Sequence, residues 1–153
     1  MKLIINKYFI LFLSIVIAGL LYGGYVIFQP VKIIASHKNA YTWHILVDKF
    51  PLTSKARIYW WLENKEILFK SYGVPENWLT ENNIAVWRFG DGYKALEKYD
   101  RPCFDDMPPP KNCIEKDRLM YITLTRNGEV SYWLNNTRYI QKANGELVEV
   151  GFN

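Results

Sequence analysis

The sequence has few of the side chains on which metal sites and redox enzymes depend. Its 153 residues include two cysteines and two histidines. A zinc site needs about four ligands at characteristic spacings, whereas His37 and His44 are seven positions apart and far from Cys103 and Cys113. No coherent catalytic set is present either. We therefore expect no metal, no cofactor and no enzymatic activity.

The chain also has little net charge. Its 19 Lys and Arg residues stand against 15 Asp and Glu residues, which gives +4. The two signs are mixed, as in "LENKEILFK" and "YKALEKYD", and such mixing is typical of a solvated surface, not of a stripe that follows nucleic-acid phosphates. The glycines in "GDG" are too few for a phosphate-binding loop and fit a tight turn. The composition thus predicts neither nucleic-acid nor nucleotide binding.

Charge is absent altogether between Lys7 and Lys32. The apolar run "YFILFLSIVIAGLLYGGYVIF", residues 8–28, rises about 31 Å as a helix and so matches a hydrocarbon core of about 30 Å. A cleaved signal peptide is the alternative, but this run is longer than the usual apolar region of about 7–15 residues and no A-x-A-like site follows it. We therefore predict an uncleaved signal anchor, with a transmembrane helix at residues 8–28.

The charges next to this helix do not decide its orientation. Lys2 and Lys7 precede it, and Lys32 and Lys38 follow it. In an oxidising compartment, however, two cysteines ten positions apart should pair, and closing so short a loop stabilises a fold by roughly 2–3 kcal/mol. This predicts a single-pass protein of the bacterial inner membrane, with a cytoplasmic tail at residues 1–7 and a periplasmic domain at residues 31–153.

The cysteines enclose "CFDDMPPPKNC", for which other interpretations exist. A reactive cysteine would need a nearby base and a depressed pKa. Asp105 and Asp106 could act as an acid–base or cation-binding pair, but adjacent acidic residues in a loop usually face water or cap a turn. The three prolines restrict the backbone. We predict that a Cys103–Cys113 disulfide closes a rigid surface loop.

The remaining chain predicts an α+β domain with a mainly antiparallel sheet and one principal amphipathic helix. Strands are expected in "VKIIAS", "YTWHILV" and "NIAVWRF", and then in a meander of "LMYITLT", "EVSYWL", "RYIQK" and "LVEV". Asn127-Gly128, Asn135-Asn136 and Asn144-Gly145 supply the turns of the meander. In the second strand, alternation places His44 on the more polar face. A catalytic or metal-binding role for it is the alternative to that of a surface histidine.

The amphipathic helix is expected in "TSKARIYWWLENKEILFKSYG", with Thr53 or Ser54 capping its start and Gly73 at its end. An apolar stripe, predicted to face the sheet, comprises Ile58, Trp61, Leu62, Leu68, Phe69 and Tyr72. Trp60 and Ile67 fall on roughly the opposite side. Either another segment, such as the cysteine loop, covers them, or they anchor a partner protein.

Several motifs carry a resemblance to a known family: "QPVKIIASH" after the apolar run, "IYWWLENKEIL", "FGDGYK", and above all "YDRPCFDDMPPPKNCIEKDRLM". The sequence resembles, over nearly its whole length, a family of enterobacterial single-span membrane proteins of unknown function. The resemblance implies a bacterial envelope protein and supplies no catalytic residues.

Two classes of function are compatible with the sequence. The first is a membrane-anchored module that binds an envelope or toxin protein, one version being an immunity protein that blocks a bacterial toxin. The alternative is a glycan-binding or cell-wall-binding protein, because aromatic residues, which can stack on sugars, make up 16% of the chain. A cell-wall hydrolase belongs to the same class, with Asp105, Asp106 or Glu81 as candidate acids. A hydrolase would need two carboxyl groups roughly 5–10 Å apart across a cleft, which no sequence pattern here establishes.

Overall fold

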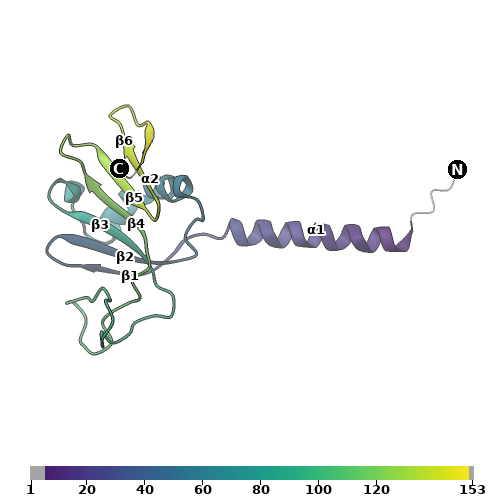
Figure 1. Cartoon of the computed structure of the whole chain (residues 1–153), viewed down its shortest axis with the longest axis horizontal. Coiled ribbons are helices and arrows are strands. Elements are labelled where there is room, and N and C mark those ends of the chain that lie inside the picture. The colour runs from purple at the N-terminus through teal and green to yellow at the C-terminus, as the bar shows by residue number, and fades with distance from the viewer. Residues whose placement is uncertain (1–5, 152–153) are drawn as a thin grey trace. The chain divides into compact units, whose positions relative to one another are not determined.

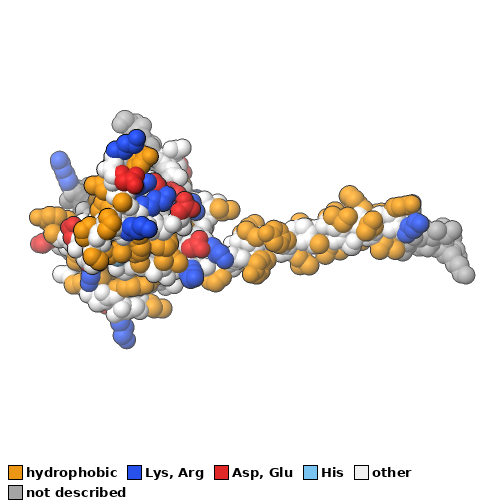
Figure 2. Space-filling view, turned by 90° about the horizontal axis from the view of Figure 1, so that it is seen from below, with side chains coloured by type: hydrophobic (Ala, Val, Ile, Leu, Met, Phe, Trp, Pro, Cys, Tyr) orange, Lys and Arg blue, Asp and Glu red, His pale blue; other side chains and the backbone are white. Residues whose placement is uncertain are grey.

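A computed structural model describes residues 6–151 of the chain (Figure 1). The chain divides into two compact units, Met1–Pro30 and Val31–Asn153. The first unit contains α1 (Lys7–Ile27), which differs by one residue at each end from the predicted helix. No residue of α1 is buried, and apolar side chains cover it along its length (Figure 2). With a mean hydropathy of 2.3, α1 is long and apolar enough to cross a membrane.

The second unit is an α+β domain, as predicted. A seven-stranded sheet has its strands in the order of the chain. The elements, in chain order, are β1 (Lys32–Lys38), β2 (Thr42–Asp48), α2 (Ser54–Ser71), the short 3₁₀ helix η1 (Trp78–Thr80), β3 (Asn83–Arg88), β4 (Arg118–Leu124), β5 (Val130–Leu134), β6 (Thr137–Gln141) and β7 (Leu147–Val150). Each predicted strand is present to within two residues at either end.

The sheet is antiparallel except at one place, where β2 and β3 pair in parallel. Parallel neighbours need a long crossover connection, and the connection from β2 to β3 contains α2.

The Thr53 side chain caps α2 by accepting a hydrogen bond from the Ala56 amide at 3.3 Å. At the meander turns, Gly128 and Gly145 have φ angles of 78° and 86°, which glycine adopts without steric cost.

Packing of α2 on one face of the sheet forms the larger hydrophobic core. The predicted stripe lies there: Ile58, Trp61, Leu68 and Phe69 are buried, and Leu62 and Tyr72 pack partly buried beside them. On the sheet, Trp43, Ile45 and Val47 of β2 are fully buried. Alternate residues of the strand therefore face the helix, as expected for a half-buried strand.

The opposite face of the sheet is covered by a long connection between β3 and β4, residues 89–117, here called the disulfide loop. Phe104 and Ile114 of this loop pack against Leu46, Ala85 and Trp87 and form a second, smaller core. The predicted disulfide joins Cys103 to Cys113. Backbone hydrogen bonds in both directions link Lys94 to Cys113, so the ends of the loop are held together close to the disulfide.

Candidate functional site

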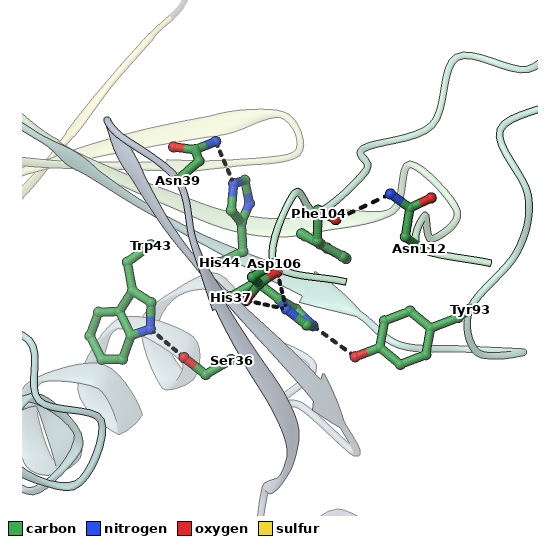
Figure 3. A network of polar contacts seen from close by, with 9 residues as sticks. All are labelled: Ser36, His37, Asn39, Trp43, His44, Tyr93, Phe104, Asp106 and Asn112. Atoms are coloured by element: carbon green, nitrogen blue, oxygen red, sulfur yellow. Dashed lines mark hydrogen bonds and ion pairs between the residues drawn. The ribbon is translucent and has the colours of Figure 1, made fainter. Parts of the chain in front are cut away.

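A polar network connects β1 to the disulfide loop (Figure 3). His37 is 7% exposed, and its Nδ1 lies 2.9 Å from each carboxylate oxygen of Asp106. Since an ionised carboxylate can only accept, Nδ1–H is the donor. Nε2 then accepts a hydrogen bond from the Tyr93 hydroxyl at 2.7 Å. The imidazole also stacks on Phe104, with ring centres 4.1 Å apart. Both ring nitrogens of His37 therefore hydrogen-bond to the disulfide loop, and the ring also stacks on a loop side chain.

His44 lies directly opposite His37 in the pairing of β1 with β2. Its Nδ1 accepts a hydrogen bond from the indole N–H of Trp87 at 3.0 Å, and Nε2 is 3.2 Å from the Asn39 amide nitrogen. The pKa of His44 is lowered to about 4, mainly by burial and secondarily by the nearby His37, with Asp106 acting in the opposite direction. At neutral pH the ring is therefore uncharged, which suits its role as acceptor for Trp87.

The other ionisable groups of the disulfide loop are also held in fixed states. Burial, and secondarily the charge of Asp106, raise the pKa of Tyr93 above its usual value, so its hydroxyl stays protonated and can donate to His37. Hydrogen bonds from Lys94 and Arg101, each 2.9 Å long, lower the pKa of Glu115. Glu115, near the end of the loop, is thus joined to Lys94 near its start and to Arg101 in its middle.

An Asp–His–Tyr chain is chemically able to relay a proton, and the Asp106 side chain is 45% exposed, but the crevice beside the buried His37 is narrow. The crevice lined by His37, His44, Phe104 and Asp106 has about 160 Å³ of empty volume and leaves no room for a water-sized molecule. Among residues 6–151, no group of three or more His, Cys, Asp or Glu side chains is arranged to hold a metal ion. The geometry supports a structural role, in which the network clamps the loop to the sheet.

The sequence-predicted residues fall in separate places. Cys103 and Cys113 form the disulfide, and Asp106 is in the network, whereas Asp105 is exposed. His44 lies on the sheet face opposite α2, as alternation predicts, but it is half-buried beneath the loop.

On α2, Trp60 is half-buried and packs edge-on against Phe50, with ring centres 5.1 Å apart. The suggestion that the cysteine loop covers this side of the helix is wrong, because the loop packs on the opposite face of the sheet. Ile67 is 66% exposed. It borders an open groove of about 540 Å³ beside the C-terminal half of α2.

The network of His37 was missed in the sequence. A signal for it was present: a short turn between the first two strands places His37 opposite His44, and hence on the face away from Trp43. The partners Asp106 and Tyr93 lie 69 and 56 positions along the chain, and no local pattern connects them to His37.

Comparison with known proteins agrees with the N-terminal helix. No curated protein and no solved structure has significant similarity to the chain. One family model matches residues 5–151, nearly the whole sequence. The chain therefore belongs to the family described as "Enterobacterial putative membrane protein (DUF943)".

Proposed function

We propose that the protein is a single-pass inner-membrane protein whose periplasmic domain binds a protein partner through the outer side of α2. The observation that carries this proposal is the exposure of large apolar side chains there. Ile67 is 66% exposed and Tyr59 54%, and Leu52, just before the helix, is 80% exposed. Apolar side chains gathered on one surface of a small domain are typical of an interaction site.

The groove beside Ile67 has the anatomy of an interface. Its lining combines apolar Phe69, Val74 and Pro75 with charged Glu66, Lys70 and Glu76. An apolar centre with a polar rim is the arrangement found at protein–protein interfaces. Trp60, supported by Phe50, would stiffen the helix behind this surface, and Ile67 would be the anchor that a partner covers.

The disulfide supports the periplasmic location, because disulfides persist in oxidising compartments and are rare in the cytosol. Alkylation in intact cells with a membrane-impermeant, mass-shifting thiol reagent tests this orientation. We expect Cys103 and Cys113 to be labelled only after reduction, and without breaching the inner membrane. Labelling without reduction, and only after the membrane is breached, would place the domain in the cytoplasm.

The partner surface is tested by replacing Ile67 with a photo-reactive amino acid in cells that produce the full-length protein. We expect a discrete crosslinked adduct from position 67, and none from Arg126, an exposed residue in the β4–β5 turn. Ile67→Asp should abolish a second adduct made from position 59. Equal adducts from positions 67 and 126, or none at either, would contradict the proposed surface.

A specific version of this proposal is immunity to a bacterial toxin that enters the envelope. Its support is a small domain, a single anchor, and an apolar surface away from the structural clamp around His37. Coexpression with toxins encoded beside the gene should restore growth, and Ile67→Asp should remove that rescue. Absence of any rescue would eliminate the immunity version and leave other protein partners.

The proposed role is non-enzymatic. Both ring nitrogens of His37 are engaged within the domain, and the adjoining crevice is closed to water. His37→Gln should therefore leave the adduct from position 67 unchanged. Release of fragments from peptidoglycan by the purified domain would instead favour the cell-wall alternative.

A further inference from the structure

A row of cationic and aromatic side chains crosses β4, β5 and β6 on the sheet face opposite α2. It consists of Arg118, Tyr121, Trp133 and Arg138, here called the Arg–aromatic row. Tyr121 pairs directly with Trp133, and Trp133 with Arg138. The guanidinium of Arg118 lies 4.8 Å from the centre of the Tyr121 ring, and that of Arg138 lies 4.4 Å from the centre of Trp133. Both cations are thus held against rings and pre-oriented.

A bulge in β4 brings Arg118 into this row. Met120 pairs with Val86, but the next pair along is Trp87 with Arg118, so Leu119 is the extra residue. In a regular strand Arg118 would share the face of Met120, which packs toward α2. Bulges commonly redirect a side chain in this way.

The bulge is fixed from the other side of the sheet. Arg57, a buried residue of α2, donates from Nη1 to the Leu119 carbonyl at 3.0 Å and from Nε to the Pro51 carbonyl at 2.7 Å. A buried guanidinium that satisfies a bulged carbonyl makes this local geometry costly to lose. The position of Arg118 is therefore built into the fold.

The two guanidiniums of the row have capacity for anions, although Nε of Arg138 already donates to the Ser131 hydroxyl at 2.9 Å. Within the described part of the chain, residues 6–151, neither Arg118 nor Arg138 forms an ion pair with a carboxylate. Arg118 and Trp133 border an open groove of about 580 Å³, which is also lined by Trp87, Lys116, Leu134 and Asn135. An arginine stacked on a ring keeps its N–H edges available, and their fork geometry matches phosphate oxygens.

The tether to α1 indicates where such a phosphate would come from. The helix ends at Ile27 and β1 begins at Lys32, so only residues 28–31 separate them. Four extended residues span at most about 14 Å. The domain is therefore confined to the neighbourhood of the bilayer that holds α1, where phospholipid headgroups are the most abundant phosphates.

We propose that the Arg–aromatic row binds the phosphate of anionic phospholipid headgroups in the membrane that α1 enters. This goes beyond the proposed partner binding, because it uses the opposite face of the sheet and leaves the outer side of α2 free. It holds for either orientation of the chain, since both leaflets carry phospholipids.

The domain without its anchor provides the test. Both hydrophobic cores lie within residues 31–153 and α1 contributes no buried residue, so this unit has the packing it needs to fold alone. The purified domain is floated with vesicles of phosphatidylcholine, with or without phosphatidylglycerol. We expect it to bind only the anionic vesicles, and the double variant Arg118→Gln/Arg138→Gln to bind them at least about tenfold more weakly.

The matched control is Lys55→Gln/Arg126→Gln, which removes the same charge from two exposed residues outside the row. It should reduce binding less than about threefold. Circular dichroism checks that both variants fold. Binding of the unaltered domain to the two vesicle types tests the proposal without any substitution. Competition by glycerol phosphate at equal phosphate concentration should be weak if the headgroup at a bilayer surface is the ligand.

Four results would overturn the proposal: failure to bind anionic vesicles, equal binding to neutral ones, an equal loss in the control variant, or full competition by glycerol phosphate. Binding of an acidic peptide in place of the vesicles would assign the row to a protein ligand and would equally reject a lipid role. Because the crosslink from position 67 reports on α2, it should persist in Arg118→Gln/Arg138→Gln. The two proposals can thus fail separately.

Discussion

One face of the sheet lies under α2 and the other lies partly under the disulfide loop, and the two covers are held by different forces. The helix satisfies its own backbone hydrogen bonds, so its attachment rests mainly on an apolar stripe, which Ile58, Trp61 and Phe69 provide. The loop has no such internal ladder. It depends on a disulfide, a few backbone bridges and the His37–Asp106 pair, with a much smaller apolar contribution.

This contrast implies that damage beneath the helix should unfold the domain, whereas damage beneath the loop should open it locally. A stable domain can thus carry a long irregular segment on one face when covalent and polar contacts replace a larger core.

The largest effect is expected at Trp61, which is 1% exposed and contacts both Trp43 and Phe69. Trp61→Ala should lower the free energy of unfolding by about 3–5 kcal/mol, because it leaves a cavity beneath α2. Urea titration of the isolated domain measures this loss. Tyr59→Ala, on the exposed side of the same helix, should cost less than about 0.5 kcal/mol. Similar losses in the two variants would contradict the helix-side core.

The next effect concerns the disulfide. Cys103→Ser/Cys113→Ser should lower the free energy of unfolding by roughly 2–3 kcal/mol, because the unfolded chain loses the constraint of the closed loop. Hydrogen exchange should show the largest loss of protection within residues 94–114, where local opening adds to the global loss that α2 shares. Reducing agent should reproduce the effect in the unaltered domain and do nothing to the variant. A uniform loss of protection would contradict local opening.

A smaller, pH-dependent effect is expected from His44. Its pKa in the folded domain, about 4, lies below the ordinary histidine value of 6.5, so the unfolded chain takes up a proton first. Stability is therefore fully present above pH 6.5 and declines as the pH falls toward 4. Because the ring is partly exposed, we expect a loss of roughly 1–2 kcal/mol.

His44→Asn should flatten this part of the pH profile, since the asparagine oxygen can still accept from Trp87 and does not titrate. The neighbours His37 and Asp106 remain in this variant, so the difference between the two profiles reports on His44. An unchanged profile would contradict the assignment to His44.

The smallest effect is expected at the clamp itself. Asp106→Ala removes the acceptor of His37 Nδ1–H and should cost about 1 kcal/mol, with faster hydrogen exchange around Phe104. Asp105→Ala removes an adjacent carboxylate that is exposed and should have no measurable effect. If the two substitutions behave alike, the network does not hold the loop.

The predictability of the two faces differed for the same physical reason. Alternation and 3.6-residue periodicity encode which residues of β2 and α2 face each other, so Trp43, Ile58 and Trp61 could be placed in the core from sequence alone. The disulfide could also be predicted, because the cysteines are few and close in sequence. The surface on which the loop packs could not be predicted, because irregular segments have no periodic pattern of apolar residues. His37 and Asp106 come together only in the folded domain.

The candidate surfaces show the same limit. Periodicity placed Trp60 and Ile67 away from the main stripe, but only the packing of Phe50 separates the half-buried residue from the exposed one. The Arg–aromatic row depends on a one-residue bulge at Leu119, which a strict alternation of strand residues would have missed.

The order of the strands in the sheet bears on how the protein is made. Because neighbours in the sheet are also successive in the chain, each strand that emerges during synthesis meets an edge already formed by the preceding one. Contacts of short sequence separation favour fast folding. Two connections are long: α2 intervenes between β2 and β3, and the disulfide loop intervenes between β3 and β4. Both cysteines precede β4. Oxidation can therefore close the loop before the meander is added, so the domain can assemble in the direction in which it is synthesised.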